Sequence, residues 1–142
     1  MILIDVNVLV YAKRLDSPNH LKFRAWLEEA LGSDSIIGLS HLVLSGVVRI
    51  LTHPQIFGVP TQLDEALEYV NSLRANPACI PVSPGERHWE IFTRLCKSAG
   101  AKGNLVSDAF FAALAIESGA EWVTADRDYA RFPGLRWRHP LA

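Results

Sequence analysis

The chain has 142 residues, an ordinary length for one domain, and we expect residues 1–142 to form a single domain. Hydrophobic residues make up 49% and charged residues 20%, a balance typical of globular proteins that bury a core without disulfide or metal staples. The formal net charge of −1 excludes a protein that binds DNA or RNA through bulk positive charge alone, so any phosphate contact requires a local basic patch.

The chain starts with a predicted strand and two predicted helices. Residues 1–5 (MILID) form a short apolar run rich in branched side chains, which predicts a buried strand. Residues 6–14 predict a helix that follows this strand directly. After a break at SPNH, in which Asn19 is a candidate cap, residues 20–32 show helical spacing and end in a glycine.

The middle of the chain repeats this order. Residues 35–40 predict a second strand, and residues 41–54 predict a mostly buried helix that stops at its final proline. Thr61 is expected to cap the next helix, over residues 62–77. The apolar positions of that helix are expected to share one face, and they are Leu63, Ala66, Leu67, Val70 and Leu73.

The last part of the chain adds three strands and two helices. The strands are expected at residues 78–83, 121–126 and 135–140, and the helices at residues 84–100 and 107–119. Pro81 indicates a strand at a sheet edge or a bulge, and Ser107 is expected to cap the last helix. Because strands and helices alternate, the sequence predicts an α/β fold: a three-layer α/β/α domain around a mostly parallel sheet of four or five strands.

Cysteine usage and hydropathy give an expectation for the compartment. Cys79 and Cys96 show no metal-ligand spacing, so we expect two reduced thiols packed as small apolar groups. No apolar run is long enough to cross a bilayer, and no signal peptide precedes the first strand. The sequence therefore favours a cytoplasmic protein with no membrane partner.

Three aspartates stand where predicted elements meet. Asp5 ends the first strand, Asp126 ends the fourth strand, and Asp108 opens the helix over residues 107–119. Sites in open parallel sheets form at the carboxyl ends of strands, in the crevice where the strand order reverses. We therefore expect the three carboxylates to converge.

Each aspartate also has a purely structural interpretation. Asp5 is suited to cap the helix after it, Asp108 to interact with a helix N-terminus, and Asp126 to start a turn. Convergence accounts for all three together. Clustered carboxylates repel one another unless a cation neutralises them, and oxygen ligands without His or Cys suit Mg²⁺ or Mn²⁺. Such sites typically carry out phosphoryl chemistry.

Three segments of the chain resemble one known family. MILIDVNVLVYA, GLSHLVLSGVVRILTHP and GNLVSDAFFAALAIESGAEWVTADRDYARFPGLRW look like parts of the PIN domain of the VapC toxin family, in the same order, from Met1 to Trp137. The resemblance implies a metal-dependent endoribonuclease, using Mg²⁺ or Mn²⁺, that is the toxin of a type II toxin–antitoxin pair. It also implies an RNA substrate, a homodimer and a VapB-like antitoxin that blocks the cleft.

The functional residues of that family are carried over position by position. Asp5 and Asp108 match its metal ligands. Asp126 matches an acid that binds a second ion or holds the attacking water, and we assign it the catalytic role. Asn7 and Thr124 match polar positions that support these acids by hydrogen bonds.

One position departs from the family pattern. Many PIN nucleases carry a glutamate near the middle of the helix over residues 41–54, where this chain has Gly46 beside Ser45. A glycine inside a helix lowers its stability by about 1 kcal/mol relative to alanine, so Gly46 serves either close packing or a wider RNA cleft. With one carboxylate missing, we expect one tightly bound ion and a second that is weak or brought by the substrate.

Several further residues have two open interpretations. Lys13 and Arg14 either contact RNA phosphates or form a solvated helix end. Trp89 and Phe92 belong either to the core or to an apolar groove for an antitoxin helix.

Asp128 is expected to cap the short helix after it. Four arginines form either a basic patch or a solvated face, and they are Arg127, Arg131, Arg136 and Arg138.

Two other functions remain open. The missing glutamate also fits a catalytically weak or inactive PIN-like module that binds RNA or protein. A phosphohydrolase with a covalent aspartyl intermediate generally needs a second acid two residues after the nucleophile. Asn7 stands at that distance from Asp5, which disfavours this chemistry.

Overall fold

Five short parallel strands form the middle layer of the protein in a computed structural model that describes residues 1–142. The strands are β1 (Ile2–Ile4), β2 (Ile37–Leu39), β3 (Cys79–Pro81), β4 (Glu121–Val123) and β5 (Trp137–Arg138). Their order across the sheet is β3-β2-β1-β4-β5. The register pairs Leu3 of β1 with Gly38 of β2 and with Trp122 of β4. The strand containing Pro81 lies at an edge, as predicted.

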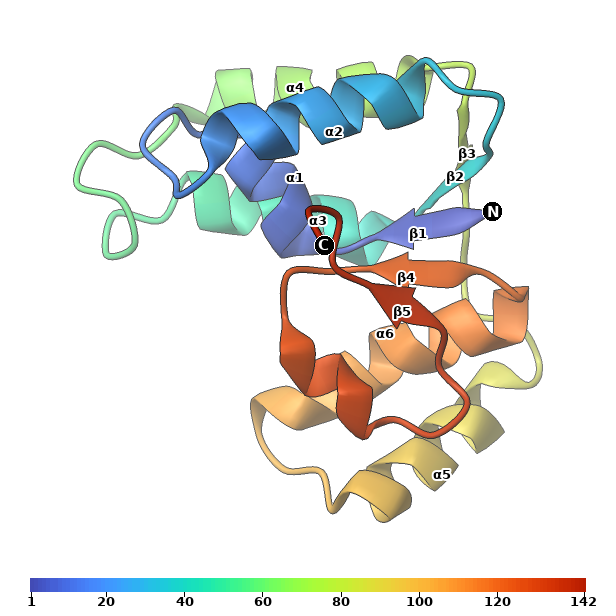
Figure 1. Cartoon of the computed structure of the whole chain (residues 1–142). Helices are drawn as coiled ribbons and strands as arrows, with labels where there is room; N and C mark the ends of the chain where they lie inside the picture. The colour runs from blue at the N-terminus through green and yellow to red at the C-terminus, as the bar shows by residue number, and fades with distance from the viewer.

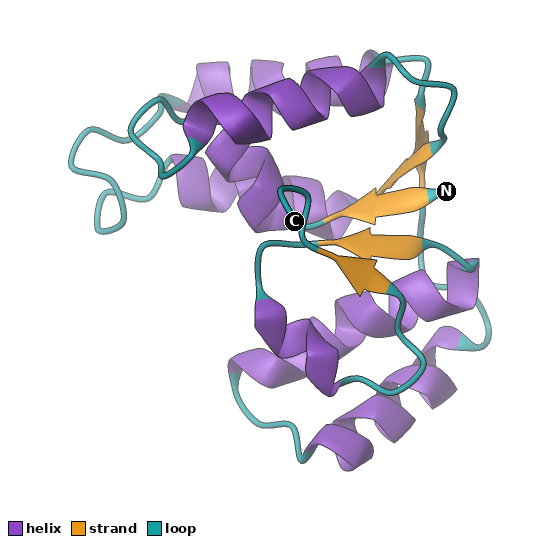
Figure 2. Ribbon diagram, in the orientation of Figure 1, coloured by secondary structure: helices purple, strands orange, loops and turns teal.

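Helices cover both faces of this sheet, which confirms the predicted three-layer α/β/α fold (Figures 1 and 2). One face carries α1 (Val6–Lys13), α2 (His20–Leu31), α3 (His41–Leu51) and α4 (Leu63–Ala75). The other face carries α5 (His88–Ala99), α6 (Asn104–Ser118) and the short 3-10 helix η1 (Arg127–Arg131).

The path of the chain creates a crevice beside β1. The first three strands are linked by α1 to α4 on one face, and the sheet grows from β1 to β3. The chain then crosses by α5 and α6 on the other face and returns to β4, next to β1. The strand order therefore reverses between β1 and β4, which is where parallel α/β sheets form sites.

The core is a cluster of 28 buried apolar residues that lies on both sides of the sheet. Leu3 and Ile4 of β1 are 2% and 1% exposed, as expected for a parallel strand covered on both faces. Trp122 of β4 is fully buried, and its ring lies 5.5 Å from the rings of Phe111 and Tyr129, measured between centroids. This aromatic stack fixes η1 and α6 against the sheet.

The start of α6 differs from the predicted one. The helix begins at Asn104, three residues before the expected Ser107 cap, because Gly103 adopts a positive φ of 58° that turns the chain into the helix. Ser107 therefore lies inside the helix. Asp108 is its fifth residue and not one of the first two, so it does not cap the helix N-terminus.

The other two predicted caps have different outcomes. Thr61 does not cap α4, because Gln62 occupies the N-cap position and the Thr61 hydroxyl lies 3.4 Å from a guanidinium nitrogen of Arg14. Asn19 is the N-cap residue of α2, as predicted, although its backbone is left-handed and its side chain makes no cap hydrogen bond. For Thr61 a neighbouring segment decides the partner of the side chain, and for Asn19 the backbone conformation does so.

The predicted apolar face of α4 is only partly buried. Ala66, Val70 and Leu73 are buried, whereas Leu63 and Leu67 are 56% and 40% exposed. The helix packs against α3 at the outer edge of its layer, so only a narrow stripe of it is covered.

Cys79 and Cys96 are free thiols, as predicted. None of the helices has the length and apolar character needed to cross a membrane.

Gly38 provides a test of the packing between β1 and β2. A Cβ atom at this position would overlap the Leu3 side chain and lie 2.7 Å from Cγ2 of Val82. We expect Gly38→Ala to lower the free energy of unfolding by about 1–3 kcal/mol, measured by chemical denaturation. The control is Gly58→Ala, where no atom lies within 4 Å of the added methyl group. This change should be neutral or stabilising by about 0.4–1 kcal/mol. Equal effects of the two changes would contradict the packing argument.

Candidate active site

Asp5 lies at the carboxyl end of β1 and is 7% exposed. Its Oδ1 accepts a hydrogen bond from the backbone N–H of Val6 at 2.7 Å, so Asp5 is the N-cap of α1. Its Oδ2 accepts a hydrogen bond from the hydroxyl of Thr124 at 2.7 Å. Asp5 therefore caps α1 through Oδ1 and takes part in the candidate site through Oδ2, so both interpretations apply.

Thr124 and Asn7 join the ends of β1 and β4. The Asn7 amide nitrogen lies 3.4 Å from Asp5 Oδ2 and 3.4 Å from the Thr124 hydroxyl. The Asn7 side-chain oxygen accepts a hydrogen bond from the backbone of Ala125, and Thr124 Oγ1 accepts one from the backbone of Asp126. The structure thus places both supporting residues beside Asp5, where they orient its carboxylate and the turn that carries Asp126.

Asp108 reaches the same region from α6. Its side chain is held by the hydroxyl of Tyr129, which donates a hydrogen bond to Oδ1 at 3.3 Å. Tyr129 is 1% exposed and belongs to η1. Tyr129 could not be found from the sequence, because a tyrosine in a short polar segment carries no signal of which carboxylate it will contact.

Asp126 follows β4 and is the N-cap of η1. Its Oδ1 accepts a hydrogen bond from the backbone N–H of Asp128 at 2.9 Å. The prediction that Asp128 caps this helix is therefore wrong: Asp128 lies in its first turn, 3.9 Å from the guanidinium of Arg131. Oδ2 of Asp126 has no hydrogen-bond partner in the protein and is free to interact with water or substrate.

The predicted site residues share one cavity. Asp5, Asp108 and Asp126 all line a cavity of about 1100 Å³, together with Asn7 and Asp128. No three acidic, histidine or cysteine side chains lie close enough to bind one metal ion directly. The carboxylates thus line the same cavity, but they do not form a complete metal-coordination site by themselves.

Electrostatics in the cavity favour a cation. The pKa of Asp5 is raised to about 6, chiefly by burial. Hydrogen bonds from Thr124 and Val6 partly oppose this rise, and the charges of Asp108 and Asp126 add to it. The pKa of Asp108 is also raised, chiefly by burial and then by Asp126. The carboxylates therefore repel one another across the cavity, and a bound cation would relieve this repulsion.

The donor set fits a hard divalent ion. All the donors at the centre are carboxylate, amide or hydroxyl oxygens, which Mg²⁺ and Mn²⁺ prefer. Mg²⁺ usually keeps several waters and binds through one or two carboxylates, so an open arrangement is compatible with it. Asp5 and Asp108 are the residues that would hold such an ion.

Gly46 has a packing role. A Cβ atom at Gly46 would lie 3.0 Å from Cγ2 of Val6, the residue directly after Asp5. The absence of a side chain lets α3 approach α1 closely at this point. The packing interpretation therefore holds, and no carboxylate from α3 enters the cavity.

Positive side chains border the cavity at other points. Arg49 of α3, Lys102 of the α5–α6 loop and Arg131 of η1 all line it. Arg49 and Lys102 have no ion-pair or side-chain hydrogen-bond partner. Of the four C-terminal arginines, only Arg131 lines the cavity. Arg138 lies elsewhere and pairs with Glu121.

The remaining candidates lie elsewhere. Lys13 pairs with Glu65 at 3.2 Å, and the donors of Arg14 are occupied within the protein, so neither is a free phosphate contact. Trp89 is 68% exposed, and its ring lies 5.2 Å from that of Phe92 on α5, outside the cavity.

Comparisons with known proteins identify the family. The family model of the PIN domain matches residues 2–135. The VapC ribonuclease Mb2897 of Mycobacterium bovis is 45% identical, covering 99% of this chain and 96% of its own length. Ribonuclease VapC25 of Mycobacterium tuberculosis is 39% identical, covering 99% of each chain.

A solved structure shows the same fold. VapBC2 from Rickettsia felis, crystallised with a DNA fragment from its promoter, contains a chain that matches with a TM-score of 0.73, at 18% identity, over 98% of each chain. With the family match over almost the whole sequence, the conclusion is plain: this chain belongs to the PIN domain family, among the VapC ribonucleases.

Proposed function

We propose that the protein is a Mg²⁺-dependent endoribonuclease and the toxin of a VapBC-type toxin–antitoxin pair, acting in the cytoplasm as a single PIN domain. The observation that carries the proposal is the shared cavity of Asp5, Asp108 and Asp126 at the carboxyl ends of β1 and β4. The relatives that are named ribonucleases support the reaction class.

Asp5 and Asp108 would hold the divalent ion, with Mn²⁺ as an alternative to Mg²⁺. When bound, the ion supplies positive charge that polarises the phosphate and lowers the pKa of water. Thr124 and Asn7 orient the Asp5 carboxylate, and Tyr129 orients that of Asp108. Asp126 keeps Oδ2 free of protein partners, so this oxygen can accept the proton of the attacking water.

The positive side chains that border the cavity, Arg49, Lys102 and Arg131, suit a substrate with a phosphate backbone such as RNA. An exposed guanidinium without a protein partner, such as that of Arg49, is free to contact a phosphate of the backbone. Three cations from three different elements border the same cavity as the acids. A flexible single-stranded segment would bring successive phosphates to them while one phosphodiester lies at the acids.

Protein partners are proposed from the wider family. The fold neighbours include VapBC complexes from Haemophilus influenzae and Salmonella typhimurium. We propose that this chain likewise binds a VapB-like antitoxin that blocks the cavity, and that it forms a homodimer.

Gly46 motivates a second candidate function, a weak or inactive PIN-like module that binds RNA or protein. Because the helix α3 contributes no carboxylate, the cavity has fewer ligands than many PIN nucleases. Isothermal titration with Mg²⁺ separates the two candidates. Mg²⁺ binding by the wild type that is lost in Asp5→Ala supports the nuclease. If the wild type does not bind Mg²⁺, the result supports the non-catalytic binding module.

Removal of Asp108 should stop cleavage without unfolding the protein. We expect Asp108→Asn to lower Mg²⁺-dependent RNA cleavage by more than about a hundredfold, because the ion loses a charged ligand, and EDTA should stop cleavage by the wild type. The measurement is gel analysis of RNA fragments, with circular dichroism as the check on folding. Asp34→Asn, at an exposed aspartate outside the cavity, is the matched control. Undiminished cleavage by Asp108→Asn would refute its role as a ligand.

Asp5 should make the stability of the metal-free protein depend on pH. The folded protein holds the Asp5 proton up to a pKa of about 6, whereas the unfolded chain releases it near 3.8. Between these two pKa values the folded state binds more protons than the unfolded state. A rise in pH through this window therefore lowers the free energy of unfolding, and this loss of stability is complete above pH 6. Asp5→Asn has no proton to lose and should be more stable than the wild type at pH 7.5 by on the order of 3 kcal/mol.

The comparison is made by thermal unfolding in EDTA at several pH values. The two proteins should differ little near pH 4 and diverge as the pH rises to 6. A constant difference over this range would mean that the Asp5 pKa is not raised.

Arg49 should contribute to RNA binding. In the Asp108→Asn background, where RNA stays intact, Arg49→Gln should weaken binding and reduce the slope of log K against log salt by about 0.7, the value for one phosphate contact on a single strand. Fluorescence anisotropy over a salt series measures this slope. Arg74→Gln, an exposed arginine outside the cavity, should leave the slope unchanged, and equal slopes for both variants would remove Arg49 from the RNA contact.

A further inference from the structure

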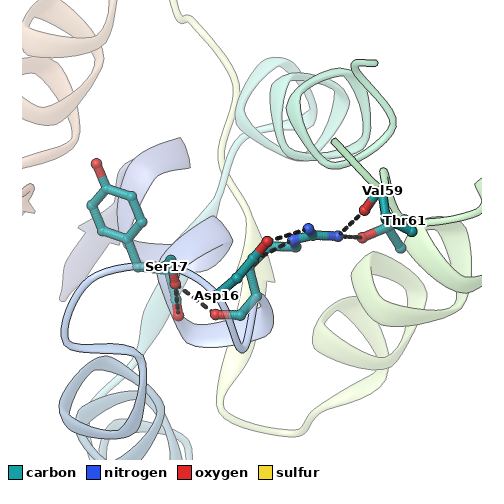
Figure 3. Close-up of polar contacts among 6 residues, drawn as sticks. Asp16, Ser17, Val59 and Thr61 are labelled. Carbon is teal, nitrogen blue, oxygen red and sulfur yellow. Dashed lines mark hydrogen bonds and ion pairs between the residues drawn. The ribbon is translucent and has the colours of Figure 1, made fainter. Parts of the chain in front are cut away.

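One arginine joins two loops that are far apart in the sequence (Figure 3). Arg14 begins the loop between α1 and α2, and its Nε and Nη2 donate hydrogen bonds to the two carboxylate oxygens of Asp16 at 2.8 and 2.6 Å. Its Nη1 donates to the backbone carbonyl of Val59 at 2.8 Å and lies 3.4 Å from the Thr61 hydroxyl. Val59 and Thr61 belong to the loop between α3 and α4.

The guanidinium of Arg14 is well suited to this role. Its side chain is 14% exposed, and its plane stacks on the ring of Phe57 at 4.0 Å from the centroid. The Ser17 hydroxyl closes the first loop, since it lies 2.6 Å from the carbonyl of Arg14. A lysine would carry the same charge, but it has neither the planar fork that binds Asp16 at two points nor the flat face that stacks on Phe57.

Arg14 is the residue that links the middle of the α3–α4 loop to another part of the chain. The loop projects from the body of the molecule (Figure 1). Ile56 and Phe57 are tied to the carbonyl of His53, a contact within the loop itself. The two ends of the loop are bonded to α3, since His53 N–H donates to the carbonyl of Ile50 and Thr61 N–H donates to that of Leu51. Between these ends, the Val59 carbonyl is the only group that is hydrogen-bonded to another segment of the chain, and its partner is Arg14.

Both loops form part of the wall of the cavity that holds the acids. The first contributes Asp16, Ser17 and Pro18, and the second contributes an apolar surface made of Ile56 and Phe57. Ile56 is 50% exposed, although it is a large aliphatic residue. Carboxylates and a metal ion account for the handling of phosphate, but an apolar surface in the same cavity suits the flat face of a nucleobase.

We propose that Arg14 is a positioning residue for the RNA substrate. It holds the α3–α4 loop so that Ile56 and Phe57 form the surface on which a nucleobase next to the cleaved phosphodiester packs. Arg14 does not contact RNA itself, because its donors are occupied within the protein. The inference rests on the proposed endoribonuclease function and adds to it a surface for substrate selection.

The test uses two variants of the full chain that act on the same surface from different sides. Arg14→Lys removes the clamp and keeps the charge, and Ile56→Asn removes the apolar surface at an exposed position where folding should tolerate the change. Each variant should raise KM for RNA about tenfold and leave kcat at saturating Mg²⁺ and the Mg²⁺ affinity unchanged. Arg24→Lys, in the exposed pair with Glu28 on α2, is the matched control and should behave as the wild type.

A double variant distinguishes positioning from general stabilisation. Because both residues act through one surface, Arg14→Lys combined with Ile56→Asn should raise KM no further than either single change. Hydrogen exchange at the backbone amides of residues 56–59 should speed up in Arg14→Lys and not in Ile56→Asn. Together these results would support the assignment.

Other outcomes would overturn it. A loss of kcat at unchanged KM, a fall in activity that only follows the fraction of folded protein, or additive effects in the double variant would each show that Arg14 is merely structural. Wild-type-like KM for both variants, in a wild type that cuts RNA, would overturn this inference alone. A wild type that leaves RNA intact in the presence of Mg²⁺ would overturn the proposed function and this inference with it.

Discussion

The hydrogen bond between Asp5 and Thr124 is the interaction on which the site depends. A carboxylate that is 7% exposed must be satisfied by donors, since an unpaired buried charge destabilises a protein strongly. Thr124, directly after β4, and the backbone of Val6, at the start of α1, provide these donors. Their geometry fixes the relative position of two strand ends that are 119 residues apart in the sequence.

The remaining parts of the site follow from this junction. Thr124 also accepts the backbone N–H of Asp126, so the turn that presents Asp126 is set by the same hydroxyl that binds Asp5. Tyr129, packed on the buried ring of Trp122, then orients Asp108. The protein itself holds the carboxylates in place, which would lower the reorganisation needed in a reaction at this site.

The periphery of the cavity differs in character from its centre. The centre is built at the ends of strands and on α6, whereas part of the wall consists of the α1–α2 and α3–α4 loops. The tight approach of Gly46 to Val6 brings α3 close to α1, and with it Arg49 to the border of the cavity. Arg14 performs a similar task for the α3–α4 loop. The rigid centre suits a reaction common to a family, and loop walls can vary with the substrate.

The sequence by itself determined the order and type of the elements and the presence of acids at their junctions. Apolar runs such as MILID and the helical spacing of residues 20–32 are local signals, and they are sufficient to place strands and helices. Only the tertiary structure decided which side chains meet. Asp126 and not Asp128 caps η1, α6 begins at Asn104, and Tyr129 and Arg14 gained roles that no local pattern indicates. The physical reason is that these outcomes depend on distances between segments remote in the chain, which the packing of the layers sets and which local propensity does not contain.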